Sequence, residues 1–310
     1  MLRFEVTYKD KRAFQLGNVL TAELDRQLDV PADSLTLTVP YNRTLIENAD
    51  MLSAYSGDEQ VFFGQIDEIV TVKQSGGLIS RLSARSLAAA LLDNEAEPLE
   101  YNNPSSRLIY NRHLAPFGIT EYDEERHPLY GNFRISKGMS HWQVIENYCK
   151  KRYGAIPRIS GSRAYLKGIE AEGEALFGGD GTSYFEMREY RRRCKLISKV
   201  RLMFSTVAGY GSYILNENPE CEGVERVRFV NALADNTSVD TAQSIIDAGN
   251  RDSYFIKLKC VGSKLEILGK AAIVDDNELG RIENLRVYGV NYKLNSGGEL
   301  TTVVLRKEKF

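Results

Sequence analysis

The chain has 310 residues, of which 43% are hydrophobic and 26% charged, and its 40 basic and 42 acidic residues give a net charge of −2. This balance is ordinary for a globular protein of two or three domains and argues against a specific nucleic-acid or anionic-membrane partner. The longest apolar runs are far shorter than the roughly 20 residues of a membrane helix, and the start MLRFEVTYKDKRAF lacks a signal-peptide core. We therefore expect a protein that is made and folded in the cytoplasm.

Residues 1–86 predict a first β domain. Apolar and polar residues alternate from Leu2 to Tyr8 and again in DSLTLTVPY, where Pro40 ends the strand because it cannot donate to a sheet. The run VFFGQIDEIVTVK predicts a long strand with a bulge or bend at Gly64. Five or six short antiparallel strands of this kind favour a small β-barrel, which leaves no sheet edge open.

Residues 87–183 predict an α+β middle domain. RSLAAALLDNE and SSRLIYNRHLAPFG are typical of two helices, the second ended by Pro116, and a capping box at Ser140 begins a third helix that Gly154 ends. AIPRISGSRAYLKG then predicts a hairpin. The glycine-rich stretch 170–183 predicts a linker; its FGGDGTS lacks the Lys-Ser/Thr ending of a phosphate-binding loop, so we expect no cofactor there.

Residues 184–310 predict a second β-barrel with a short inserted helix. KLISKVRLMFST and GYGSYILNE resume strand character, and SVDTAQSIIDAGN predicts the helix, with Ser238 or Asp240 as N-cap and Gly249 just past its end. Four further β runs follow from Tyr254. The predicted fold class is thus α+β and mainly β, with two similar small antiparallel β-barrel domains flanking the middle domain.

One strand–turn–strand unit recurs near the two ends of the chain. VFFGQIDEIVTVK precedes one Ser-Gly-Gly turn and LRVYGVNYKLN precedes another, although matching their central glycines requires a gap of four residues. Two similar β-modules in one chain let a trimer present six similar units around a ring. The turns are therefore candidate interface residues, with plain turn geometry as the alternative: Ser75, Gly76, Gly77, Ser296, Gly297 and Gly298.

The run REYRRRCK (188–195) is the one strongly basic segment. Its arginines Arg191, Arg192 and Arg193 are weaker interface candidates, because such a run could meet an acidic protein surface or nucleic acid in a channel. A solvated strand face remains the simpler interpretation.

No catalytic or metal-binding motif is present, and we expect neither an enzyme nor a metal site. Paired carboxylates could run glycoside hydrolysis, but adjacent acids in a polar stretch are typical of a solvated loop. The histidines form no zinc-binding pattern, and the four cysteines are too scattered for a metal site and are expected to be free, mostly buried thiols. The carboxylates are Glu121, Asp123, Glu124, Glu125, Asp275 and Asp276. The histidines are His113, His127 and His141, and the cysteines are Cys149, Cys194, Cys221 and Cys260.

Several segments resemble the baseplate hub proteins of phage tails, in the late-control-D group of contractile-tailed phages and phage-tail-like bacteriocins. LDVPADSLTLTVPYN, GDEQVFFGQIDEI and ISRLSARSLAAALLDNEAEP resemble the amino-terminal part of those proteins. YGAIPRISGSRAYLKG resembles their middle domain, and GKAAIVDDNELGRIENLRVYGVNYKLNSGGELTTVVLRK resembles their second barrel. The resemblance covers nearly the whole chain.

The resemblance implies a structural homotrimer whose six barrel domains form a pseudo-sixfold ring in a virion or tail-like particle. Such a hub joins the hexameric tail tube, or a tube-initiator protein, to a trimeric central spike, and it also meets baseplate wedge proteins and the tape measure protein. The chain ends at Phe310, soon after the second barrel. We therefore expect the spike and any wall hydrolase to be separate chains.

Two other classes of protein stay open. One is another symmetric tail or secretion adaptor, such as a distal tail protein or a type VI spike-like protein, which would continue into a further β segment. The other is a glycan hydrolase or glycan-binding module, in which alanine at Glu124 or Asp275 would abolish wall-clearing activity.

Overall fold

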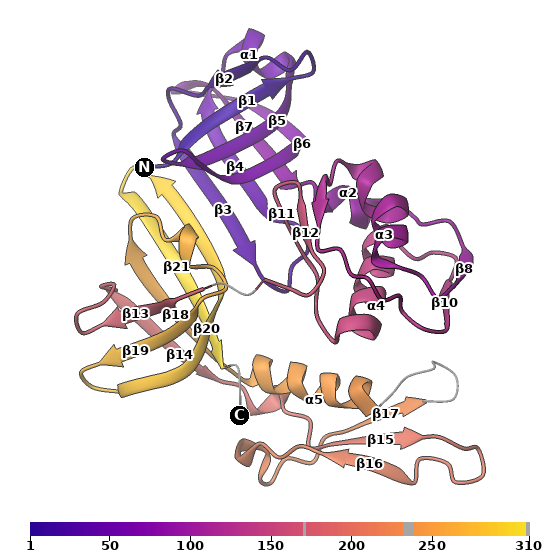
Figure 1. Ribbon diagram of the computed structural model, residues 1–310. Coiled ribbons are helices and arrows are strands. Elements are labelled where there is room, and N and C mark those ends of the chain that lie inside the picture. The colour runs from indigo at the N-terminus through magenta and orange to yellow at the C-terminus, as the bar shows by residue number, and fades with distance from the viewer. Residues whose placement is uncertain (170–171, 232–238, 308–310) are drawn as a thin grey trace. The chain divides into compact units, whose positions relative to one another are not determined.

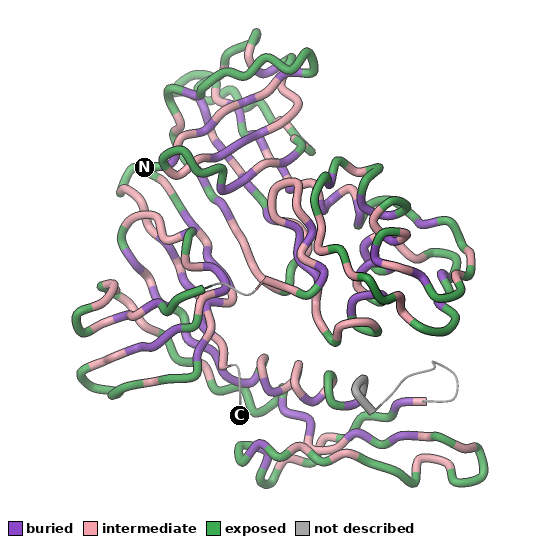
Figure 2. The backbone as a smooth tube through the Cα atoms, in the orientation of Figure 1, coloured by how far each residue is buried: buried purple, intermediate pink, exposed green. Residues whose placement is uncertain are grey.

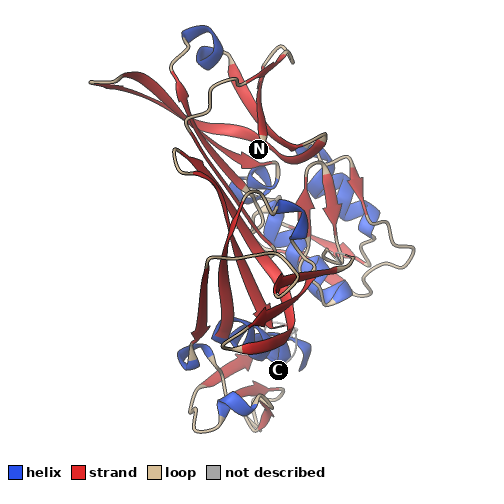
Figure 3. Cartoon of the chain, turned by 90° about the vertical axis from the view of Figure 1, so that its left-hand side faces the viewer, coloured by secondary structure: helices blue, strands red, loops and turns tan. Residues whose placement is uncertain are grey.

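The computed structural model describes residues 1–169, 172–231 and 239–307, and these divide into two compact units (Figure 1). Strands outnumber helices in each unit (Figure 3), as the predicted mainly-β class requires. No helix in the described part of the chain is long and apolar enough to cross a membrane. Unit 1 comprises Met1–Ala171, Cys260–Gly269 and Tyr288–Thr302; unit 2 comprises Glu172–Lys259, Lys270–Val287 and Val303–Phe310.

The first part of unit 1 is an antiparallel sheet in the strand order β3-β4-β7-β6-β5-β1-β2. Buried residues alternate along β1 and β4 (Figure 2), which confirms the pattern predicted from Leu2 to Tyr8 and in DSLTLTVPY. Closure of this sheet into a barrel stays a prediction. Its elements are β1 (Arg3–Tyr8), β2 (Ala13–Gln15), β3 (Thr21–Gln27), β4 (Ser34–Pro40), α1 (Arg43–Glu47), β5 (Ala49–Ser56), β6 (Glu59–Gln74) and β7 (Gly77–Ser86).

The bulge predicted at Gly64 lies elsewhere. Gly64 pairs regularly with Leu52 on β5 and with Ser86 on β7, and the β6–β7 register shifts between Ile66 and Glu68 instead. A Cβ at Gly64 would overlap the carbonyl group of Arg85 and lie 2.7 Å from the Phe62 ring. The glycine therefore permits close backbone approach rather than a bend.

Residues 88–166 form a hydrophobic core of their own around Ile109, Trp142, Ile145 and Tyr148. Helix α4 begins at the predicted capping box, in which the Ser140 and Gln143 side chains each bind the other's backbone N–H, and it ends at Gly154 in the left-handed region. The predicted hairpin is β11–β12. The elements are α2 (Ala88–Asp93), β8 (Leu99–Asn102), α3 (Ser106–Ile109), β9 (Glu121–Tyr122), β10 (Asn132–Ile135), α4 (His141–Tyr153), β11 (Arg158–Ser160) and β12 (Arg163–Tyr165).

The second predicted helix does not stop at Pro116. After α3 the chain continues as a π-helical turn over Tyr110–Leu114 and a 3₁₀ turn over Ala115–Phe117, and Gly118 ends it with φ of 79°. Proline is tolerated there because the first residues of a helical turn need no N–H donor.

A buried ion pair ties β11 to the loop between β3 and β4 within unit 1. The Arg158 guanidinium, 1% exposed, binds Asp33 and the backbone carbonyls of Gln27 and Val30, while Arg26 reaches the same carboxylate at 3.2 Å. A charge this deeply buried is retained only when it is paired and hydrogen-bonded.

The predicted linker contains a buried strand, so that prediction is wrong for Glu174–Gly178. This strand, β13, pairs in parallel with β19 and buries Phe177 completely. The glycines that suggested a linker serve a tight turn: Gly178 has φ of 74°, and a Cβ there would overlap the Asp275 carbonyl oxygen.

Residues 199–253 form a separate layer rather than strands of a second barrel. Strand β15 pairs with β16 and in parallel with β17, and α5 packs on them through Val200, Leu202, Ala242 and Ile246. The insertion is therefore larger than the single helix that the sequence predicts. These elements are β15 (Lys199–Met203), β16 (Ser212–Leu215), β17 (Val227–Asn231) and α5 (Val239–Ser253).

Helix α5 continues through Gly249, so the predicted end at that residue is wrong. A Cβ at Gly249 would lie 2.9 Å from the Lys195 carbonyl oxygen, which explains a glycine inside the helix. Asp240 lies within the helix rather than at its N-cap, and Ser238 lies outside the described residues.

The remaining strands are β13 (Glu174–Gly178), β14 (Glu186–Arg191), β18 (Tyr254–Val261), β19 (Ala271–Asp276), β20 (Gly280–Asn295) and β21 (Gly298–Lys307). The first part of β20 belongs to unit 2, and its second part, from Tyr288, belongs to unit 1. The three-domain division into 1–86, 87–183 and 184–310 stays a prediction.

Candidate assembly interface

The two predicted strand–turn–strand units are hairpins of equal dimensions. In each, a 16-residue strand (β6, β20) and a 10-residue strand (β7, β21) are joined by two residues. Gly77 and Gly298 begin the return strands with φ of 121° and 106°, a conformation that favours glycine. When the hairpins are aligned at their turns, their strands match without the predicted four-residue gap. In this alignment Gly64 corresponds to Leu285 and Gly289 to Glu68, so the two central glycines do not correspond to each other.

The repeat extends to six strands with the same pairing order. The first set pairs as β3-β4-β7-β6-β5-β1 and the second as β14-β18-β21-β20-β19-β13, with corresponding strands in the same chain order. The sets differ in one respect, since β1 runs antiparallel to β5 whereas β13 runs parallel to β19. Figure 1 labels the strands of both sets.

Backbone hydrogen bonds fix which residues correspond. The Tyr41 N–H donates to the Leu78 carbonyl at 3.0 Å, and Gly262 donates to Glu299 at 2.9 Å at the same place in the second set. Likewise Leu20 donates to Thr38 at 2.8 Å, and Phe185 donates to Lys259 at 3.0 Å. The correspondence therefore holds residue by residue across β3 and β14, β4 and β18, and the two hairpins.

The hairpin tips are at the surface, as the predicted role requires. Ser75, Gly76 and Gly77 are exposed, as are Ser296 and Gly297, while Gly298 is half-buried. A Cβ at Gly76 or Gly77 would meet open space. Whether these tips contact another chain stays a prediction.

The predicted basic run ends strand β14, and its arginines are exposed and have different partners. Arg191 binds Glu189 at 2.9 Å, and this bond raises the pKa of the arginine. Arg192 lies 4.6 Å above the Phe255 ring, which in turn stacks on Tyr190. Arg193 donates to the Glu222 carbonyl. The run therefore combines a strand edge, positive charge and an aromatic surface.

The candidate catalytic acids of the TEYDEERH segment bind basic side chains of their own unit. Arg163 binds Glu121 at 2.9 Å and Asp123 at 3.3 Å, and Lys167 binds Glu125 at 2.5 Å. The Lys167 bond lowers the pKa of Glu125. These ion pairs tie β9 to β12 and the chain after it, while Glu124 is exposed.

The second acid pair holds the turn between β19 and β20. Tyr184 donates to Asp276, whose carboxylate also accepts the Leu279 and Glu278 N–H groups, and these bonds lower the pKa of Asp276. Asp275 lies beside the Gly178–Gly179 turn. A turn of this kind accounts for both acids without a catalytic role.

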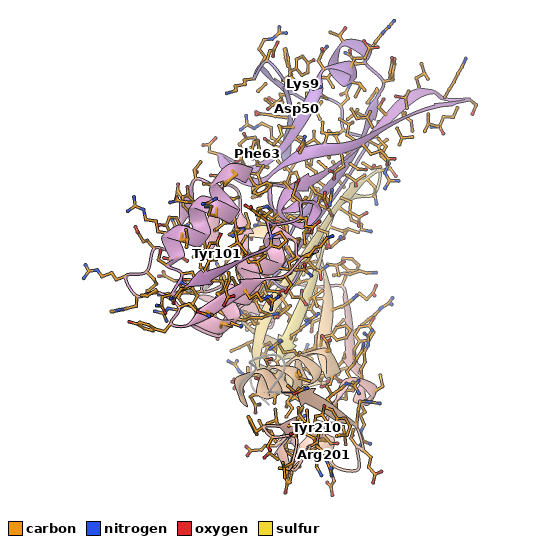
Figure 4. All side chains as sticks on the ribbon, turned by 90° about the vertical axis from the view of Figure 1, so that its right-hand side faces the viewer. Lys9, Asp50, Phe63, Tyr101, Arg201 and Tyr210 are labelled. Atoms are coloured by element: carbon orange, nitrogen blue, oxygen red, sulfur yellow. The ribbon has the colours of Figure 1, made fainter. Side chains whose placement is uncertain are left out.

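Two histidines meet in the core of residues 88–166, which the sequence analysis did not predict. His113 Nδ1 lies 3.0 Å from His141 Nδ1, and the hydroxyl of Tyr101 (labelled in Figure 4) lies 3.2 Å from His113 Nε2. The pKa of His113 is lowered to about 4, mainly by burial and secondly by the neighbouring His141. His127 is exposed. No local motif links positions 113 and 141, so only the fold reveals the pair.

The four cysteines are free thiols, as predicted, and three of them are buried. Cys194, which follows the arginine run, is exposed. Burial raises the pKa of Cys149, Cys221 and Cys260. Within the described ranges, no group of three or more His, Cys, Asp or Glu side chains is arranged to hold a metal ion.

The sequence matches no family model and no curated protein. Solved structures do match. The tail protein from Neisseria meningitidis MC58 is 16% identical, with 99% of this chain and 96% of that chain covered and a TM-score of 0.78. The 43 kDa tail protein of prophage MuSo2 from Shewanella oneidensis is 15% identical, with 98% and 97% covered and a TM-score of 0.76.

A third similar structure is c3393 from E. coli, described as a type VI secretion component with structural similarity to the T4 bacteriophage tail proteins gp27 and gp5. It is 12% identical, with 94% of this chain and 74% of that chain covered and a TM-score of 0.60. Identities this low show a shared fold. The chain therefore has the fold of these tail proteins over nearly its whole length.

Proposed function

We propose that this protein is the structural baseplate hub of a contractile phage tail or phage-tail-like particle. Three copies would form a pseudo-sixfold ring that joins a hexameric tail tube to a trimeric central spike. One observation carries the proposal: a single chain contains the same six-strand set twice. Three chains then supply six similar sets, which is how a threefold assembly can match a sixfold neighbour.

The matching tail proteins support the proposal through their fold, since each is covered over nearly its full length. The partners follow from the two symmetries. The sixfold side would meet the tube or a tube-initiator protein, the threefold side would meet the spike, and wedge proteins would bind the outside. The axial opening would hold the tape measure protein.

The mass of the purified chain in solution tests this proposal. Light scattering should give a species near three times the 34.9 kDa of one chain. A protein that stays monomeric at high concentration would contradict a self-assembling hub.

A second candidate is the corresponding adaptor of a secretion system, which the similarity to c3393 favours. Both candidates require the same threefold ring, so their difference lies in the partner. A pull-down from the producing bacterium separates them, because a phage hub should recover tail proteins and an adaptor should recover secretion components.

A further inference from the structure

We propose that copies of this chain join by adding strand β14 of one copy to the free half of β6 in the next, in a defined antiparallel register. The inference rests on the proposed trimer and names the strands that would close it. It follows from a junction that the chain already makes within itself.

That junction is the pairing of β20 with β3 inside unit 1. Gly289 to Leu294 of β20 pair antiparallel with Gln27 to Ala22 of β3, and the Leu28 N–H donates to the Tyr288 carbonyl at 2.9 Å. Strand β20 belongs to the second set and β3 to the first. The edge strand of one set is therefore added to the long hairpin strand of the other.

The counterpart of that half of β20 has an open edge. Strand β6 pairs with β5 only over Glu59–Gln65, and in the described structure its residues 67–74 pair with β7 alone. In β20 the paired half buries Val290 and Tyr292 to 1% and 0% exposure, whereas their counterparts on β6 are the half-buried Ile69 and the exposed Thr71. On the other face of β6, Val70 and Val72 are 39% and 41% exposed. An exposed strand edge with β-branched residues is a template for another strand.

The counterpart of β3 has an open edge as well. Among the described strands, β14 pairs only with β18, and the Arg192 N–H donates to the Ser253 carbonyl. In an antiparallel ladder, alternate residues direct their backbone N–H and C=O groups to opposite sides of the strand. On β14 the backbone groups that point away from β18 are those of Met187, Glu189 and Arg191. These three residues of β14 correspond to Ala22, Leu24 and Arg26 on β3. By the same alternation, the backbone N–H and C=O groups of those β3 residues point toward β20.

The residue correspondence then sets the register between copies. Glu68 would face Arg192, Val70 would face Tyr190, and Val72 would face Arg188. Opposite charges thus meet at one end, and a valine meets an aromatic ring that already stacks on Phe255 at 4.4 Å. Within the chain the pair that corresponds to Val72 and Arg188 is the Lys293–Glu23 ion pair at 3.0 Å.

A disulfide tests this register. In a Cys194→Ser background, which removes the exposed thiol, Val72→Cys and Arg188→Cys would lie opposite each other at a position where their Cβ atoms are close enough to bridge. Oxidation with diamide should convert the chain into a covalent trimer on a non-reducing gel. The control is Val70→Cys with Arg188→Cys, which uses the same strands two residues out of register and should stay unlinked.

The outcomes separate this inference from the hub proposal. A covalent trimer in the first variant alone supports the pairing. If light scattering shows a trimer but the disulfide forms in neither double-cysteine variant, or equally in both, the pairing is overturned and the hub proposal remains intact. A monomer without covalent products overturns both.

A charge exchange gives a second readout that needs no oxidation. Glu68→Arg and Arg192→Glu should each weaken trimer formation by about tenfold, because like charges would then face each other, and the double variant should recover it. Glu59→Arg, on the part of β6 already paired with β5, is the matched control and should leave the trimer unchanged. Additive weakening in the double variant would contradict the register.

Discussion

The His113–His141 pair makes the core of residues 88–166 sensitive to mild acid. Burial holds the pKa of His113 at about 4, below its usual 6.5, so the unfolded chain binds a proton in this range that the folded chain does not. Stability is therefore fully present above pH 6.5 and is lost as the pH falls toward 4. The loss between pH 7.5 and 5 should be about 2 kcal/mol.

Urea unfolding at pH 7.5 and pH 5 measures this effect. The wild-type chain should lose more stability on acidification than His113→Gln, because the variant keeps only His141 of the two histidines whose pKa burial lowers. His127→Gln, at an exposed position, should behave as the wild type. Equal losses in all three proteins would show that the buried pair does not set the acid response.

At this scale the sequence predicted residues whose roles are local. Ser140 and Gly154 end α4 through contacts within a few residues of themselves, and Pro40 acts through its own missing N–H. The contact between His113 and His141 and the place of Gly249 inside α5 could not be predicted from the sequence, because the fold brings their neighbours to them.

At the scale of an element, glycines in one hairpin have different tolerances for a side chain. Gly64→Ala should destabilise the protein by about 1–3 kcal/mol, because the added methyl group overlaps the Arg85 carbonyl group. Gly76→Ala is the matched control in the same hairpin. It has open space and no positive φ, so its effect should stay within about 0.5 kcal/mol.

Thermal or urea unfolding of both variants checks this difference. Equal stabilities for the two alanine variants would mean that the Arg85 backbone moves aside at no cost. A loss at Gly76→Ala confined to trimer formation would instead support a contact between copies at the hairpin tip.

Elements with a strong local pattern were predicted well, and elements defined by their partners were not. The alternation in β1 and β4 and the capped helix α4 were recognised from the sequence. The sequence predicts a linker at β13, since a five-residue strand in a stretch with four glycines shows little alternating pattern. The strand character of β15 and β16 predicts barrel strands, because a sequence pattern does not reveal which strands pair.

At the scale of the whole molecule, the duplicated six-strand set is the feature that links fold to assembly. The sequence revealed only its hairpins, through the two Ser-Gly-Gly turns, and placed their glycines in correspondence incorrectly. The pairing order and backbone bonds define the rest. A chain that joins its second set to its first through β20 and β3 leaves two matching strand edges unpaired in its described part, β14 and residues 67–74 of β6.

Three such chains would close a ring in which the junctions between copies are of the same kind as the junction within each chain. The hub account requires this equivalence. Cryo-electron microscopy of the purified chain tests that requirement most directly. The account predicts a ring of three copies, with six similar strand sets around an axial opening and β14 of each copy beside β6 of the next. A monomer, another copy number, or a trimer with both strand edges facing solvent would contradict it.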